Sequence, residues 1–160
     1  MYLIRGQHNL DLFNSRFPRV RLCGTIGNFD GLHLGHQAIL NKVKKNAQQN
    51  DAKTIVFFTE PHASEYFAKV RDQNIMPPPR ICPWREKLKL LRQNKIDFAF
   101  FLKFNDSLRT MPPEDFISEI LESINLVSIT VGDDFRFGEN RKGDSNLLKS
   151  WGYKNNVVVE

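Results

Sequence analysis

The stretch GNFDGLHLGH, residues 27–36, decides the fold. Residues 20–26 before it are largely apolar, as in a short buried strand, and apolar residues recur at helical spacing over residues 39–47. The stretch is therefore predicted to turn a strand into a helix that begins near Leu34. Its glycines let the backbone turn sharply and approach a ligand closely. Because a helix N-terminus offers unpaired N–H groups and partial positive charge, this turn is suited to hold a phosphate.

Two histidines, His33 and His36, flank the opening turn of the predicted helix, so both can face one anion. Each feature alone has a plainer explanation, because histidines beside turns are often satisfied polar groups and glycine-rich turns often serve packing. The ordered string closely resembles the signature G-x-F-D-G-x-H-x-G-H of the nucleotidyltransferase superfamily. With Gln37 included, it resembles the FMN adenylyltransferase module of prokaryotic bifunctional FAD synthetases. The resemblance implies that His33 and His36 are catalytic and contact the phosphates of ATP.

The resemblance also implies an ATP site spread over this whole turn. Its residues would be Gly27, Asn28, Phe29, Asp30, His33, Gly35 and His36. From its chemistry, Asn28 could orient a hydroxyl or phosphate of the nucleotide. Asp30 could instead brace the turn by accepting backbone N–H groups.

A second turn follows the apolar run of residues 54–59, which is typical of a parallel strand buried on both faces. The family resembled here has F-x-P-H-P at this place, and this sequence keeps the central Pro-His. It differs in having Ala63 at the last proline and one extra residue between the phenylalanine and the first proline. The resemblance implies FMN contacts for Phe58, Pro61 and His62, although His62 could equally be a simple turn residue.

The rest of the chain alternates helical and strand patterns. Residues 2–4 are expected to form an edge strand, with surface connections over residues 5–19 and from residue 63 to the proline-rich residues 76–80. Arg80 either reaches a phosphate or is solvated. A helix is expected after Pro83, with Trp84, Leu88 and Leu91 on its buried side. A strand at 98–102, a helix at 112–124 and a strand at 127–131 are expected to follow.

A second distinctive string, GDDFRFGENRKGD at residues 132–144, follows the last of these strands. Glycines, both charge signs and two aromatic residues suit a binding loop better than a core, and the plainer alternative is a long surface connection. The string matches the pattern G-x-D-F-x-F-G-x-x-R-x-G of flavin-adenylating enzymes at every specified residue. The resemblance implies that Asp134, Phe135, Phe137 and Arg141 help to build the FMN site.

The alternation predicts an α/β protein with a Rossmann-like open parallel sheet and helices on both faces, in one domain over residues 1–160. Both strings and the Pro-His turn follow strands, so they should converge at the carboxyl edge of the sheet. The family module continues with an I-S-S-T-x-x-R-like ATP-binding string and then a riboflavin kinase module. The chain is therefore expected to be truncated before that string, to lack a kinase domain, and to bind nucleotide weakly and turn over poorly by itself. The natural full-length protein would also phosphorylate riboflavin.

Composition is that of an ordinary globular protein, with 41% apolar and 26% charged residues. The net charge of +5 suits nucleotides and nucleic acids alike, but no nucleic-acid motif accompanies it. Cys23 and Cys82 do not suggest a disulfide framework. There is no secretory signal and no apolar run approaching the ~20 residues of a membrane span. We expect a cytoplasmic protein with no membrane or nucleic-acid partner; the oligomeric state is open.

The resemblance implies that ATP and FMN are the substrates. An FMN phosphate oxygen would attack the α-phosphate of ATP in line and pyrophosphate would leave, so no enzyme nucleophile is needed. Mg²⁺ would accompany ATP without a dedicated protein metal site. Three alternatives stay open: a nucleotidyltransferase with another acceptor such as nicotinamide mononucleotide or phosphopantetheine, a metal-dependent hydrolase using His33, His36 and His62 or Asp30, and a non-catalytic module that binds nucleotides or nucleic acids.

Overall fold

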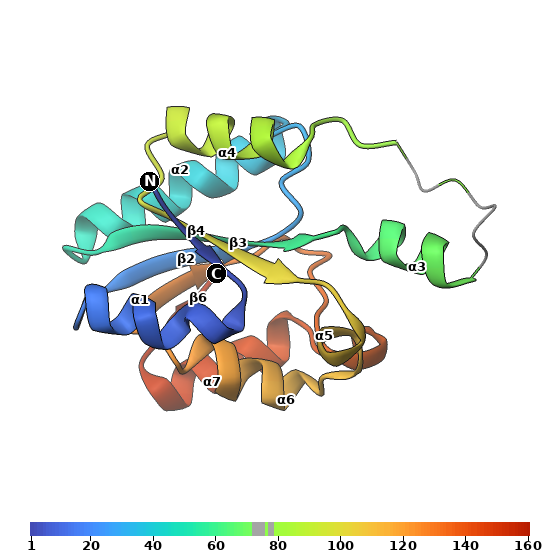
Figure 1. The fold of residues 1–160 in the computed structure, drawn as a ribbon. Coiled ribbons are helices and arrows are strands. Elements are labelled where there is room, and N and C mark those ends of the chain that lie inside the picture. The colour runs from blue at the N-terminus through green and yellow to red at the C-terminus, as the bar shows by residue number, and fades with distance from the viewer. Residues whose placement is uncertain (72–75, 77–78) are drawn as a thin grey trace.

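Six strands pair in parallel to form one sheet in the order β1-β4-β3-β2-β5-β6 (Figure 1). The structure is a computed structural model that describes residues 1–71, 76 and 79–160. The strands are β1 (Tyr2–Arg5), β2 (Leu22–Ile26), β3 (Lys53–Glu60), β4 (Phe98–Lys103), β5 (Leu126–Thr130) and β6 (Val158–Val159). The predicted open parallel sheet is confirmed, and so is the edge strand at the N-terminus.

Helices cover both faces of the sheet, as predicted (Figure 1). One face carries α2 (Leu34–Gln49) and α4 (Trp84–Gln93). The other carries α1 (Leu10–Arg16), α6 (Pro113–Phe116) with the π-helical turn η2 (Ile117–Leu121), and α7 (Ser145–Asn155). The smaller elements are η1 (Gln7–Asn9), α3 (Ala63–Arg71), α5 (Asp106–Thr110) and η3 (Glu139–Arg141).

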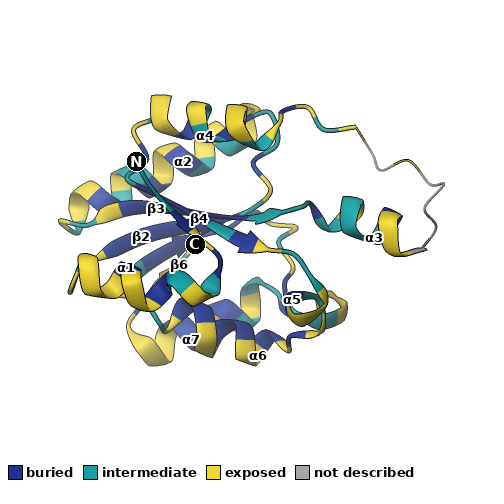
Figure 2. Cartoon of the chain, in the orientation of Figure 1, coloured by how far each residue is buried: buried dark blue, intermediate teal, exposed yellow. Residues whose placement is uncertain are grey.

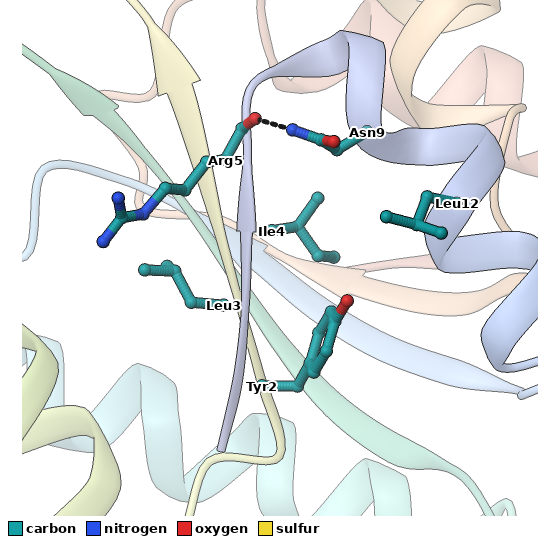
Figure 3. Close-up of a pocket in the computed structure, with 6 residues that line it drawn as sticks. All are labelled: Tyr2, Leu3, Ile4, Arg5, Asn9 and Leu12. Carbon is teal, nitrogen blue, oxygen red and sulfur yellow. Dashed lines mark hydrogen bonds between the residues drawn. The ribbon is translucent and has the colours of Figure 1, made fainter.

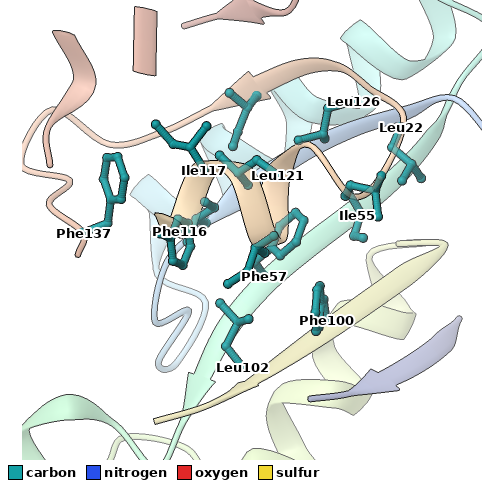
Figure 4. Close-up of a cluster of buried hydrophobic side chains, with 14 of the residues drawn as sticks. Leu22, Ile55, Phe57, Phe100, Leu102, Phe116, Ile117, Leu121, Leu126 and Phe137 are labelled. Carbon is teal, nitrogen blue, oxygen red and sulfur yellow. The ribbon is translucent and has the colours of Figure 1, made fainter. Parts of the chain in front are cut away.

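The pleat of β3 divides its side chains between two cores, because successive residues of a strand point to opposite faces. Phe57 packs among the residues under α1, η2 and α7, where Phe100 lies 5.2 Å away between ring centroids (Figure 4). Phe58 lies under α2 and α4 with Leu40 and Leu91. The four inner strands, β2 to β5, are accordingly buried along most of their length, while the outer faces of the helices are exposed (Figure 2).

The connections change face at β2, and this creates the crevice that ligands use in such folds. α2 leads from β2 to its neighbour β3 over one face, whereas the chain from β4 to β5 returns under the other face. The segments that leave β2 and β5 therefore diverge. In open α/β sheets, the space between two such segments is the usual ligand site.

Several helices differ from the prediction. Two predicted connections, residues 5–19 and the part after residue 63, contain η1, α1 and α3, and α5 and α7 lie where no helix was predicted. The predicted helix at 112–124 is shorter and changes to π-helical geometry after α6. Short polar helices give little periodicity and are stabilised by packing, as for α1 through buried Leu10 and Phe13. Of the predicted connection at 76–80, residues 77–78 lie outside the described residues.

Candidate functional site

The turn between β2 and α2 brings the two histidines together. α2 begins at Leu34, as predicted, and His33 is its N-cap: the His33 Nδ1 accepts the backbone N–H of His36 at 3.4 Å. The two imidazole rings are stacked with 3.7 Å between centroids and 22° between planes. Phe29 and Gly31 have positive φ, so the backbone turns sharply into the helix. Both imidazoles thus lie at the positive end of a 16-residue helix.

A cavity of about 640 Å³ opens at the carboxyl edge of the sheet. Both distinctive strings line it, as the topology predicted. From the first string come Gly27, Asn28, Phe29 and His36, and from the second come Gly132, Asp134, Phe135, Arg136, Phe137, Gly138, Asn140 and Arg141. The remaining lining residues are Ile26, Ile39, Thr59, Ala63, Phe67, Leu102, Phe104, Leu108, Arg109 and Phe116.

Six of the residues assigned to the site lie outside the cavity lining. From the first string these are Asp30, His33 and Gly35, and from the second turn they are Phe58, Pro61 and His62. His33 is exposed at the helix start, whereas Phe58 is fully buried in the core. The FMN contacts expected of the last three residues therefore stay a prediction that the lining of this cavity does not support.

Asp30 braces the turn, the second of the two roles considered for it. Its Oδ2 accepts the backbone N–H of Ile81 at 3.0 Å, and its Oδ1 accepts that of Cys82 at 2.9 Å. Partial burial opposes ionisation, but these two bonds hold the pKa of Asp30 below its ordinary value. The carboxylate therefore ties the histidine turn to the segment that leads into α4.

Aromatic side chains form much of the second-string side of the cavity. Phe135 and Phe137 are stacked with 5.5 Å between centroids and 16° between planes, and Phe116 lies 5.3 Å from Phe137. Two further lining residues, Phe67 of α3 and Phe104 after β4, have ring centroids 6.0 Å apart. Sequence reasoning missed this second pair, although Phe104 directly follows a strand end. A cavity with two aromatic groups offers flat surfaces to a planar ring.

The family model for FAD synthetase matches residues 20–160. The chain belongs to the FAD synthetase family. Its curated relatives include the bifunctional riboflavin kinase/FMN adenylyltransferases of Buchnera aphidicola subsp. Schizaphis graminum, 39% identical over 160 residues, and of Escherichia coli (strain K12), 36% identical over 153 residues. These alignments cover 99% and 95% of this chain but 48% and 46% of the relatives. The chain thus spans about half the length of the curated relatives that it matches.

Solved structures support the fold alone. A crystal structure titled as a macrolide-efflux protein from Streptococcus pneumoniae has a TM-score of 0.71 at 20% identity, covering 99% of this chain and 50% of that one. A pantoate-beta-alanine ligase from Francisella tularensis, complexed with beta-gamma ATP and beta-alanine, has a TM-score of 0.57 at 13% identity, covering 100% of this chain and 66% of that one. The α/β architecture of this FAD synthetase family member is therefore a shared one.

Three arginines give the cavity of this FAD synthetase family member a positive lining: Arg109, Arg136 and Arg141. Arg109 is paired with Asp106 at its rim, with 3.2 Å between Nε and Oδ1. Among the described residues that line the cavity, Asp134 is the one acidic side chain. The lining charge therefore favours an anionic ligand.

Arg80 is paired within the protein, so the second of the two roles considered for it, a solvated side chain, is wrong. Its guanidinium binds the carboxylates of Glu60 and Glu65, with 2.7 Å between Nη1 and a Glu60 oxygen. These hydrogen bonds raise the pKa of Arg80, so its guanidinium stays fully charged beside the two carboxylates. Arg80 therefore joins the end of β3 to α3 and is not solvated.

Burial lowers the pKa of His36 below 6.5, and nearby His33 and Lys87 add to the effect. Burial likewise lowers the pKa of His62, helped by Lys87 and Arg80. Both imidazoles are therefore uncharged at neutral pH. A neutral imidazole can still donate one N–H, which is what a phosphate oxygen accepts.

Acidification is expected to destabilise the chain through these two histidines. Because their folded pKa values lie below the ordinary 6.5, the unfolded chain binds protons more readily as pH falls below that value. The contribution of the two neutral histidines to the free energy of unfolding is therefore complete above about pH 6.5. It is lost as the pH falls through the folded pKa values. Urea unfolding between about pH 7.5 and pH 5 measures the slope, since carboxylates stay largely ionised in that range.

His62→Gln should flatten this pH dependence, because glutamine has no proton to gain. The control is His8→Gln, whose imidazole is exposed on η1. A pH slope that His62→Gln leaves unchanged would contradict the prediction.

A smaller groove of about 180 Å³ lies beside the edge strand β1 (Figure 3). It is lined by Tyr2, Leu3, Ile4, Arg5, Asn9 and Leu12, none of which was assigned to the site. Over the described part of the chain, no cluster of three or more His, Cys, Asp or Glu side chains could hold a metal ion, so nothing there supports the hydrolase alternative. The helices described are also too short or too polar to span a membrane.

Proposed function

We propose that this chain is the adenylyl-transferring part of an FAD synthetase: it transfers AMP from ATP to FMN, giving FAD and pyrophosphate. One observation carries the proposal. The histidine turn and the loop at residues 132–143, distant in sequence, line the same cavity. The names of the curated relatives, which include FMN adenylyltransferase, support the same reaction.

ATP is proposed to bind with its phosphates at the start of α2. The N-terminal N–H groups of that helix and the neutral imidazole of His36 would donate to phosphate oxygens. His33, stacked on His36, would complete the pair from the outer side. An FMN phosphate oxygen attacks the α-phosphorus, the bond to the bridging oxygen breaks, and pyrophosphate leaves with that electron pair. The chain's contribution is alignment and stabilisation of growing negative charge.

FMN is proposed to occupy the part of the cavity formed by the second string. Phe135 and Phe137 offer aromatic surface, and Arg141 offers positive charge for the phosphate. Phe58, Pro61 and His62 are not included, because they do not line the cavity. The histidine turn is common to many nucleotidyltransferases, whereas the pattern at residues 132–143 is that of flavin-adenylating enzymes. The loop at residues 132–143 thus favours FMN over the other acceptors considered.

Mg²⁺ is proposed to enter with ATP. The cavity fits this expectation, because the carboxylate of Asp134 is an oxygen ligand of the type that Mg²⁺ prefers, and phosphates and water supply the others. Bound there, the ion would neutralise the triphosphate and polarise the leaving group. We propose ATP and FMN as small-molecule partners, no nucleic-acid partner, and a cytoplasmic location.

The reaction is tested by incubating the full chain with ATP, Mg²⁺ and FMN. FAD should form with an equal amount of pyrophosphate, detected by chromatography of the flavin and by a coupled pyrophosphate assay. Nicotinamide mononucleotide and phosphopantetheine serve as alternative acceptors. Pyrophosphate release with either of these and none with FMN would contradict the proposal. ATP hydrolysis without transfer would favour the hydrolase.

A further inference from the structure

Lys87 is buried completely in the middle of α4, with 0% of its surface exposed. Lysine is rarely buried to this extent unless it is paired. The sequence pattern placed Trp84, Leu88 and Leu91 on the inward side of this helix. Of these three predicted residues, Leu91 is fully buried and the other two are half-buried. The inward position taken by a lysine therefore calls for an explanation beyond packing.

The ammonium group of Lys87 lies directly behind the histidine turn. Its Nζ donates to the backbone carbonyl of Asn28 at 2.5 Å and contacts Nε2 of His62 at 3.1 Å. The same Nζ lies 5.0 Å from the centroid of the Phe58 ring, within cation–π range. Asn28 itself lines the cavity, so one residue separates the buried charge from the proposed ATP site.

No carboxylate of the described residues lies within ion-pair distance of this ammonium. A buried charge without a paired ion is unfavourable, and an apolar side chain of similar volume would pack at lower cost. Burial accordingly lowers the pKa of Lys87, while Glu60 and Asp30 oppose that shift from a distance. Retaining an ammonium here costs stability, as expected when a group serves function.

We propose that Lys87 is a positioning residue for ATP: its buried ammonium fixes the carbonyl of Asn28 and supplies positive charge behind the phosphate-binding turn. The inference rests on the proposed function and identifies what holds its ATP site. It also gives Phe58 and His62 a different role. They hold Lys87, and so act on the ATP side without touching FMN.

The charge of Lys87 is also felt by His36. The groups that face His36 are His33, Lys87 and Asp30. Besides His62, the groups that face Lys87 are Glu60, Arg80, Asp30 and Cys82. Removing the ammonium while leaving the others in place should therefore raise the pKa of His36.

Two variants separate the hydrogen bond from the charge. Lys87→Met removes both, whereas Lys87→Gln keeps an N–H donor near Asn28 and removes the charge. The matched control is Lys89→Met on the same helix, because Lys89 is 63% exposed and pairs only at the surface with Glu86. Folding of each full-chain variant is checked by thermal melting.

We expect Lys87→Met to weaken binding of magnesium ATP about tenfold or more, the typical scale for a hydrogen bond to a charged group. FMN binding should change less than about twofold, and Lys89→Met should bind both ligands as the unaltered chain does. Nuclear magnetic resonance titration should show a higher His36 pKa in both Lys87 variants. Folded variants with unaltered ATP affinity and unaltered His36 titration would overturn the inference, even if they melt earlier.

Failure of this inference and failure of the proposed function give different results. If the unaltered chain forms FAD and the Lys87 variants bind ATP normally, only the inference fails. If the unaltered chain binds ATP but never transfers AMP to FMN, the proposed function fails. Should both variants unfold, the Lys87 side-chain resonance of the unaltered chain decides: it should shift on addition of magnesium ATP and not of FMN, and the absence of that shift would refute the role.

Discussion

Replacing His36 with alanine is expected to slow FAD formation at least about a hundredfold, the usual effect of removing one positioned donor from a transition state. His36 is the histidine whose side chain lines the cavity, and its lowered pKa leaves it neutral and able to donate at pH 7. The loss should appear mainly in kcat, because the charge on the phosphates grows during transfer. Steady-state assays with saturating ATP and FMN measure it.

The fold should survive this change. His36 is only partly buried, and its ring contacts Phe29 at 4.9 Å between centroids without filling the core. The melting temperature should therefore change by a few degrees at most, which corresponds to a change of about 1 kcal/mol in the free energy of unfolding. His8→Ala, at an exposed site on η1, is the control. A His36→Ala chain that melts normally and turns over at near-normal rate would refute the catalytic role.

The long elements could be predicted from the sequence because their signals are local. The apolar runs of β2 and β3 and the helical spacing in α2 specify the type of each element within a few residues. Short helices such as α1 and α5 could not be predicted, since helices of 7 and 5 residues are unstable alone. α1 depends on distant contacts, as shown by the Phe13 ring 5.2 Å from that of Phe98.

The meeting of the two strings could also be predicted, because parallel strands send their carboxyl ends to one edge. The position of the second turn relative to the cavity could not be predicted. Phe58 follows Phe57 in a pleated strand, and neither points along the strand towards the cavity at its end. Lys87 gave no signal either, since a lysine in a helix is usually solvated and its partner Asn28 is 59 residues away.

Gly138→Ala is expected to have the second large effect, by displacing the FMN side of the cavity. Gly138 has φ 70° and ψ 179°, a conformation that is essentially restricted to glycine. A Cβ atom there would lie 2.7 Å from the backbone N and Cα of Pro113, which cannot move without shifting α6. The strain alone is worth about 1–3 kcal/mol of unfolding free energy, and the clash adds to it.

Relief of this clash must move the loop away from the chain before α6. That movement would break the hydrogen bond from the Glu139 N–H to the Met111 carbonyl, which is 2.7 Å long. Phe137 and Arg141, on either side, would shift with it. Since a displacement of about 1 Å can cost about a hundredfold in a positioned reaction, FMN binding should weaken about tenfold or more and FAD formation should fall further.

ATP binding distinguishes displacement of the loop from general unfolding. The histidine turn leaves a different strand, so the Gly138→Ala chain should still bind magnesium ATP within about twofold of the unaltered chain at temperatures below its melting point. Lys142→Ala is the control in the same loop, because Lys142 makes an exposed ion pair with Glu139, a contact usually worth less than about 1 kcal/mol. If Gly138→Ala loses ATP and FMN binding equally, the two sides of the cavity are not separable. If it binds FMN normally, this loop does not hold the flavin.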